Sequence, residues 1–131
     1  MLNTKIKKKK LYLLIVINTT LNNTFLTVSL LNSQKIVLTA STGSIGFKGY
    51  LKSKPYAATQ LGYYIGQRIN SQFSKMSYTI TIKIKGFGYR RIAALRGLLK
   101  AGTFPANKIQ LLQSTSVVPF NGCRPAKKRR L

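Results

Sequence analysis

The chain has 131 residues, of which 23 are lysine or arginine and none is aspartate, glutamate or histidine, so its formal net charge is +23. Acid–base catalysis at neutral pH mostly uses the three missing residue types, and a single cysteine cannot hold zinc or a hard metal ion. The composition therefore argues against an enzyme and against any cofactor. It favours a polyanionic partner such as nucleic acid, whose phosphates attract basic side chains.

Apolar residues make up 44% of the chain and aromatic residues 10%. These proportions are typical of a globular core rather than of a disordered basic tail, and the length is close to that of a common single domain. Because Cys123 has no second cysteine with which to pair, we expect a reducing or redox-neutral compartment.

The first residues are expected to form a basic arm that leads into strands. Residues 1–10 end in four lysines, and the apolar run Leu11–Ile17 that follows is too short to cross a bilayer and lacks a small-residue cleavage site. We therefore predict a buried strand there rather than a secretory signal. Two further strands are expected at Thr24–Leu31 and Ile36–Ala40, and their short connections favour an antiparallel meander.

Residues 41–54 combine three glycines, three lysines and two aromatic residues, a composition typical of a loop. Glycines let backbone N–H groups approach a ligand closely, lysines supply positive charge, and aromatic rings can stack on bases. A flexible surface loop without a ligand is the alternative. If the loop binds RNA, the expected contacts are Gly43, Ser44, Gly46, Lys48, Gly49, Lys52 and Lys54.

Pro55 fits the first position of a helix, and Ser53 lies near the position expected for its cap. Gly62 and Gly66, four residues apart, would let another element pack closely against this helix. Apolar residues recur at helical spacing, which predicts a core-facing stripe. The stripe consists of Ala58, Leu61, Ile65, Ile69 and Phe73.

The segment Tyr78–Lys85 alternates between apolar and polar residues and is the clearest strand in the chain. A helix is expected over Arg90–Lys100, with a mild weakness at Gly97 and a left-handed cap at Gly102. A last strand is expected over Lys108–Gln113. The helix is expected to face inward with Ala94, Leu95, Leu98 and Leu99.

Together these elements predict an α/β fold: a single domain with a mixed sheet and two main helices. We expect a basic amino-terminal arm over residues 1–10 and an RNA-binding α/β domain over residues 11–115. Residues 116–131 contain two prolines and a run of four cations. We expect them to form an extended basic tail with no core of its own.

A glycine turn followed by a basic helix is the sharpest local feature. A helix N-terminus offers unpaired N–H groups and the positive end of the helix dipole, which makes it an anion site, and the planar guanidinium of arginine suits phosphates. The motif lacks the Gly-Lys-Ser/Thr of a P-loop and the acidic ribose ligand of a dinucleotide site. A plain turn beside solvated arginines is the alternative. The candidate RNA contacts are Lys85, Gly86, Gly88, Arg90, Arg91 and Arg96.

The carboxyl-terminal segment carries another basic cluster, for which a nuclear-localisation run is the alternative. Its candidate RNA contacts are Asn121, Gly122, Arg124, Lys127, Lys128, Arg129 and Arg130. Residues 119–130 read Pro-Phe-Asn-Gly-Cys-Arg-Pro-Ala-Lys-Lys-Arg-Arg. This sequence closely resembles the characteristic ending of the universal small-subunit ribosomal protein eleven family.

Four further motifs resemble the same family and occur in the same order. They are Asn-Asn-Thr at residues 22–24, Gly-Ser-Ile-Gly-Phe-Lys-Gly at 43–49, Pro-Tyr-Ala-Ala at 55–58 and Lys-Gly-Phe-Gly-Tyr-Arg-Arg at 85–91. The resemblance covers roughly residues 11–131. It adds Asn22, Asn23 and Thr24 to the candidate RNA contacts.

The resemblance implies a ribonuclease H-like fold that binds small-subunit ribosomal RNA in the platform, beside neighbouring ribosomal proteins and near the messenger RNA exit side. It supplies no catalysis. From the residues themselves we also expect no cofactor and no membrane insertion. The chain departs from the family where Phe87 and Tyr89 replace prolines and Arg90 replaces a glycine. We therefore expect a less rigid turn and a strained backbone at Arg90, which favours Arg91 as the phosphate contact.

Charge alone also permits a free nucleic-acid chaperone or compaction protein, which would sediment apart from ribosomal subunits. A membrane-active protein would need a helix with a strongly basic face, and a metal-dependent nuclease would need carboxylates; neither is expected here. The bias toward lysine, asparagine, isoleucine and tyrosine, with a start at Met1, favours an organelle-encoded protein of the mitochondrial ribosome. A plastid or the bacterial cytoplasm is the alternative location.

Overall fold

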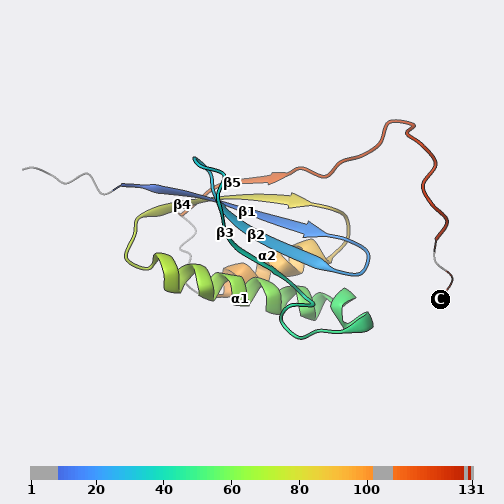
Figure 1. The fold of residues 1–131 in the computed structure, drawn as a ribbon, viewed down its shortest axis with the longest axis horizontal. Helices are drawn as coiled ribbons and strands as arrows, with labels where there is room; N and C mark the ends of the chain where they lie inside the picture. Colours follow the sequence, from blue (N-terminus) through green and yellow to red (C-terminus); the bar gives the residue numbers. More distant parts are fainter. Residues whose placement is uncertain (1–8, 102–107, 129, 131) are drawn as a thin grey trace, which may run out of the picture.

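The computed structural model describes residues 9–101, 108–128 and 130 (Figure 1). It confirms a single α/β domain with a mixed sheet and two main helices. The elements are β1 (Leu11–Thr19), β2 (Thr24–Leu30), β3 (Ile36–Ser41), the 3-10 helix η1 (Gly49–Ser53), α1 (Pro55–Phe73), β4 (Tyr78–Lys85), α2 (Arg90–Lys100) and β5 (Ile109–Ser114). Over these described ranges, no helix is long and apolar enough to cross a lipid bilayer.

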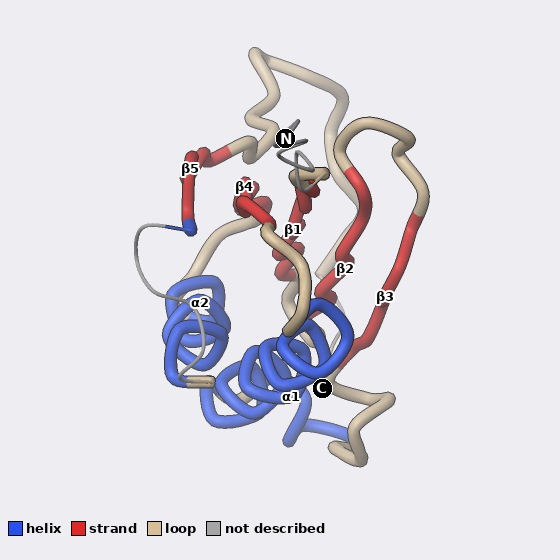
Figure 2. Tube along the Cα trace, turned by 90° about the vertical axis from the view of Figure 1, so that its left-hand side faces the viewer, coloured by secondary structure: helices blue, strands red, loops and turns tan. Residues whose placement is uncertain are grey.

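The strands form one five-stranded sheet in the order β3-β2-β1-β4-β5. β1, β2 and β3 are antiparallel neighbours joined by short turns, which confirms the predicted meander. β4 pairs with β1, and β5 with β4, in parallel, because a helix-containing crossover precedes each of them, as parallel pairing requires. Figure 2 shows that both helices cover the same face of this sheet.

The hydrophobic core lies between that face and the helices. Alternation along β1 places Leu13, Ile15 and Ile17 on the covered face, where all three are fully buried. Val28 on β2 and Ile82 on β4 lie in register on either side of Ile15. Burial of one such side chain stabilises the fold by roughly 1.5–3 kcal/mol. The centre of the sheet therefore holds its ends, and the loops that leave them, in fixed positions.

Helices α1 and α2 pack closely against each other at two glycines. A Cβ added to Gly62 of α1 would lie 2.2 Å from the Ala94 carbonyl oxygen, and one added to Gly97 of α2 would lie 2.1 Å from the Thr59 carbonyl oxygen. No real side chain tolerates such distances, so both positions require glycine. This confirms the expected close packing at Gly62. Gly97 is also a packing residue, and not only a weak point of its helix.

The inward face of α2 differs from the prediction at one position. Ala94 and Leu98 are buried and Leu95 is partly buried, but Leu99 is 42% exposed, so its expected inward orientation is wrong. Ala93 and Gly97 are buried instead. The close approach of α1 selects the small residues of α2 for the interface, and helical geometry then turns Leu99 toward solvent.

Helix α1 begins at Pro55, as predicted, but Ser53 does not cap it. Lys54 stands at the N-cap position without a side-chain hydrogen bond. The Ser53 hydroxyl, expected near the cap, donates to the Tyr50 carbonyl oxygen at 2.6 Å within η1. Local bonding within η1 therefore takes up the serine. The cap predicted at Gly102 lies outside the described residues.

Candidate RNA-binding surface

Three loops and the tail leave the sheet at the same end. β1, β3, β4 and β5 run in one direction, so their carboxyl ends lie together, on the right-hand side of Figure 1. The segments that leave these strands bring together three of the predicted motifs. We call the surface formed by residues 20–24, 42–54 and 85–91 the carboxyl edge.

The loop after β1 is tied to the loop after β3 through Asn23. Its side-chain oxygen Oδ1 accepts hydrogen bonds from the Thr24 amide, at 2.8 Å, and from the Thr42 hydroxyl. The Thr42 amide donates to the Thr24 carbonyl oxygen at 3.1 Å. Both threonines are fully buried, so they position the loops, whereas Asn22 is exposed. The sequence-based candidates did not include Thr42, because no local pattern marks it as the partner of Asn23.

The loop after β3 has a defined turn at its start. The Ser41 amide donates to the Ser44 hydroxyl oxygen at 2.9 Å, and the Ser44 hydroxyl donates to the Ser41 carbonyl oxygen at 2.8 Å. The short helix η1, which composition did not predict, forms its second half. Lys52 is half-buried, and the other predicted contacts are exposed: Gly43, Ser44, Gly46, Lys48, Gly49 and Lys54.

The turn after β4 packs directly on β1. Gly86 has a φ of 97°, and a Cβ at this position would lie 2.2 Å from the Thr19 carbonyl oxygen, so only glycine fits. The Gly86 carbonyl oxygen accepts hydrogen bonds from the Ser116 hydroxyl at 3.0 Å and from Arg91 Nη1 at 3.4 Å. This glycine therefore connects the sheet, the start of α2 and the start of the tail.

Arg90 and Arg91 stand at the beginning of α2, where no side chain caps the helix and no acidic residue lies in the first turn. Arg90 Nη1 donates to the Leu21 carbonyl oxygen at 2.7 Å, which joins α2 to the loop after β1. The backbone strain expected at Arg90 is wrong, because the positive φ angles of this turn fall on Gly86 and Gly88. Both arginines are partly exposed and oriented by the fold.

Arg96 lies further along α2 and is oriented by Tyr89. Its Nη1 donates to the Tyr89 hydroxyl oxygen at 2.8 Å, and its guanidinium carbon lies 5.8 Å from the centre of the tyrosine ring. Tyr89 therefore holds an exposed cation close to the glycine turn. Lys85, the last residue of β4, is also exposed at this edge.

The tail begins at the carboxyl edge and then leaves it. The Thr115 amide donates to the Ile84 carbonyl oxygen at 2.8 Å. From residue 117 to residue 128 every side chain is exposed and the backbone forms neither helix nor strand, and Figure 1 shows this segment extending away from the domain. Arg129 lies outside the described residues. The other predicted tail contacts lie apart from the carboxyl edge: Asn121, Gly122, Arg124, Lys127, Lys128 and Arg130.

The carboxyl edge offers positive charge without neighbouring carboxylate side chains, because the chain contains no aspartate or glutamate. An added Cβ at Gly46, Gly49 or Gly88 would meet nothing within 4 Å. The surface beside these glycines is therefore open to another molecule's backbone. Cations beside open glycines suit the phosphate groups of a nucleic acid. The cations attract the negative phosphates, and the backbone N–H groups of the glycines can donate hydrogen bonds to the phosphate oxygens.

Comparisons with known proteins agree with the resemblance of the motifs. The family model of ribosomal protein S11 matches residues 14–130. The chain is 38% identical over 127 residues to small ribosomal subunit protein uS11c of Chlorella vulgaris, which covers 97% of this chain and 92% of that protein. It is 37% identical over 129 residues to uS11 of Kosmotoga olearia, covering 95% and 92%. It is 38% identical over 117 residues to uS11m of Prototheca wickerhamii, covering 88% and 84%. The chain therefore belongs to the ribosomal protein S11 family.

Proposed function

We propose that the chain organises small-subunit ribosomal RNA through its carboxyl edge and its tail. As a member of the ribosomal protein S11 family, it is a structural, non-enzymatic constituent of the small ribosomal subunit. In this proposal the arginines and lysines of both regions contact phosphates, which reduces the repulsion between RNA strands that lie close together. The candidate contacts named above are the residues on which this proposal depends.

The observation that carries the proposal is the convergence of three motifs on one edge. Hydrogen bonds from Arg90 to Leu21 and from Thr42 to Asn23 join segments that are 69 and 19 residues apart in the sequence. Exposed cations and glycines consequently have fixed positions relative to one another. A folded RNA also presents phosphates at fixed positions, so such a surface suits it. A free chaperone needs the charge but not the fixed arrangement.

Neighbouring small-subunit ribosomal proteins are the second class of partner in this proposal. The edge strand β5 supports it, because Leu111 and Leu112 are about half exposed there, and an exposed apolar edge strand invites another chain. Messenger RNA near its exit side is a third proposed partner, and this part of the proposal rests on the family resemblance alone. For the compartment we propose the mitochondrial ribosome, on the basis of composition; the relatives include chloroplast, bacterial and mitochondrial proteins.

The test removes residues 121–131 from an epitope-tagged chain produced in its own cells. We expect the truncated chain to fold but to be largely lost from small subunits, as measured by its abundance in the subunit fraction of a sedimentation gradient. A matched control replaces Lys7–Lys10 with alanine, since this removes four cations near the other end of the sequence. Equal incorporation of the truncated and complete chains would contradict the proposed role of the tail.

A further inference from the structure

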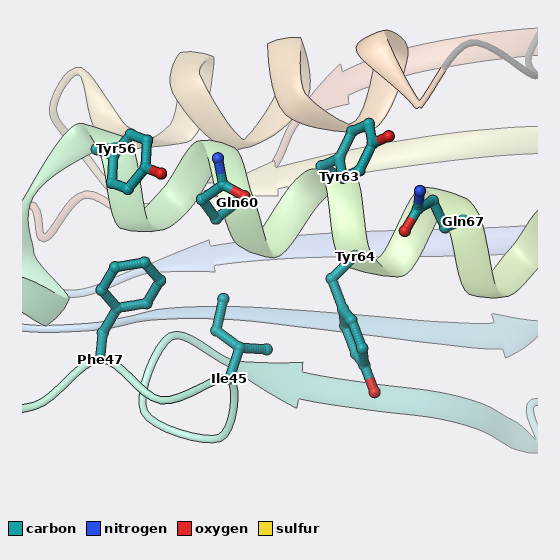
Figure 3. Close-up of a pocket in the computed structure, with 7 residues that line it drawn as sticks. All are labelled: Ile45, Phe47, Tyr56, Gln60, Tyr63, Tyr64 and Gln67. Atoms are coloured by element: carbon teal, nitrogen blue, oxygen red, sulfur yellow. The ribbon is translucent and has the colours of Figure 1, made fainter.

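A groove of about 360 Å³ runs between α1 and the loop after β3. Figure 3 shows Tyr56, Gln60, Tyr63 and Gln67 along α1, with Ile45 and Phe47 of the loop below the helix and Tyr64 pointing down from the helix to the same side as these loop residues. The lining combines four aromatic rings with two side-chain amides and contains no charged residue. It consists of Ile45, Phe47, Tyr56, Gln60, Tyr63, Tyr64 and Gln67.

The groove follows from the pattern of α1. Tyr56, Gln60, Tyr63 and Gln67 recur every three or four residues, so they share one side of the helix. The buried residues of α1, such as Leu61 and Ile65, lie on other sides. None of the tyrosines on this side is among the buried residues of α1, and their exposed aromatic area requires another explanation.

The aromatic rings of the groove are open to a ligand. Phe47 and Tyr56 meet edge to face, with ring centres 6.1 Å apart and planes at 84°, which leaves part of each ring face free. Tyr56 is 66% exposed and Tyr64 is 40% exposed. Volumes of roughly 300–1,000 Å³ are usual for small-molecule sites, so the groove has room for a single flat ring.

Positive charge flanks the groove at both ends. The Arg68 guanidinium carbon lies 5.7 Å from the centre of the Tyr64 ring. At the other end Lys48, next to Phe47 in the sequence, is exposed. An uncharged groove that is lined with aromatic rings and flanked by two cations matches a nucleotide within a strand. Its flat base suits the rings, and the phosphates on either side of it suit the cations. It matches a basic protein segment less well, because the chain carries a net charge of +23.

We propose that this groove binds an unpaired base of the ribosomal RNA. The base stacks on the exposed tyrosine rings, and the amide of Gln60 or Gln67 forms hydrogen bonds with its edge, because an amide supplies both a donor and an acceptor. Arg68 and Lys48 contact the adjoining phosphates. This inference rests on the proposed function and extends it from the carboxyl edge, with which the groove shares Ile45, Phe47 and the flanking Lys48, to the side of α1.

The test measures binding of the full chain to a short single-stranded RNA and to an abasic strand with the same number of phosphates. We expect wild type to prefer the base-bearing strand by about tenfold, the order that one stacked base contributes. The double variant Tyr56→Leu/Tyr64→Leu should lose this preference and keep its affinity for the abasic strand. Tyr12→Leu is the matched control, because Tyr12 is a partly exposed tyrosine at the start of β1, outside both the groove and the carboxyl edge.

A second pair of variants tests the glutamine amides of the groove, and both variants change the net charge by the same amount. Gln67→Glu and Gln72→Glu each add one negative charge to an exposed position of α1, but Gln72 lies outside the groove. We expect only Gln67→Glu to reduce the preference for bases. Circular dichroism of each variant verifies that the fold is retained.

The outcomes separate this inference from the proposed function. Wild-type chain that binds neither strand would contradict RNA binding altogether. Wild-type chain that binds both strands equally, or a double variant that keeps the preference, would refute the groove while leaving the carboxyl edge intact. Ultraviolet cross-linking of assembled small subunits provides an independent check. We expect a nucleotide attached to the segment from Tyr56 to Arg68, and attachment of another protein there would refute the base site.

Discussion

The α/β domain and the carboxyl-terminal tail are both basic, but different interactions set their conformations. In the domain, apolar side chains such as Ile15 of β1 and Leu61 of α1 are fully buried. In the tail, Val117 and Phe120 are 85% and 97% exposed. The domain repeats its apolar residues at strand and helix periods, so they can share one core, whereas the tail has no such period. Periodicity, rather than composition, therefore separates the part that folds on itself from the part that has no core of its own.

The same difference divides the cations into two kinds. Arg90 is oriented by the Leu21 carbonyl oxygen before any ligand arrives. Arg124 belongs to an exposed segment without regular structure, so in the proposed complex RNA would have to order both its side chain and its backbone, which costs conformational entropy. We expect the carboxyl edge to set the orientation of the protein on RNA, and the tail to add affinity that depends strongly on salt.

The largest expected effect tests the core against the tail. Ile15→Ala should lower the free energy of unfolding by roughly 2–5 kcal/mol, because it leaves a cavity at the centre of the sheet. Phe120→Ala should change it by less than about 0.5 kcal/mol, since this ring is exposed. Urea unfolding of the full chain measures both. Equal effects of the two substitutions would remove the distinction between the two regions.

The next effect concerns two glycines, one from each region. Gly97→Ala should destabilise the domain by about 1–3 kcal/mol, because the new Cβ would clash with the Thr59 carbonyl oxygen and separate the helices. Gly122→Ala should leave the stability unchanged. Thermal unfolding followed by circular dichroism is the measurement. Helix propensity alone would predict that Gly97→Ala is more stable than wild type. That result would show that α1 and α2 do not approach each other closely at Gly97.

A smaller effect is expected at the contact between the loops after β1 and β3. Thr42→Val removes the hydroxyl that donates to Asn23 and should destabilise the domain by about 0.5–1.5 kcal/mol. It should also weaken RNA binding, because the two loops lose their fixed spacing. Thr39→Val on the exposed side of β3 is the control. Unchanged stability and RNA affinity of the Thr42 variant would mean that this contact does not position the carboxyl edge.

The smallest expected effect on stability compares two arginines. Arg90→Ala and Arg124→Ala should each reduce the slope of log affinity against log salt by about one, as expected for the loss of one phosphate contact. Only Arg90→Ala should also lower the free energy of unfolding, by less than about 1 kcal/mol, because only Arg90 joins two parts of the domain. Binding at several salt concentrations and thermal unfolding measure the two quantities. A loss of stability in the Arg124 variant would contradict the division of the cations.

Local patterns predicted most of the elements because they depend on neighbouring residues. The strand Tyr78–Lys85 and the helix Arg90–Lys100 begin and end where their periodicity indicates. The orientation of Leu99 was wrong for a different reason: hydrophobicity suggests burial, but the partner helix decides which side of α2 it can approach. The helix η1 was missed because glycines and lysines obscure the weak local signal of such a short element.

The amino-acid sequence alone predicts the secondary-structure elements, the preference for a polyanion and the three motifs expected to bind it. It can do so because charge and periodicity are properties of composition and of neighbouring residues. Only the fold brings Asn23 to Thr42 and Arg90 to Leu21, and only the fold places Phe47 opposite Tyr56 to form the groove on α1. These contacts depend on the direction and order of strands across the whole sheet. Pairing between distant segments is selected by the packing of the complete core, which no local pattern specifies.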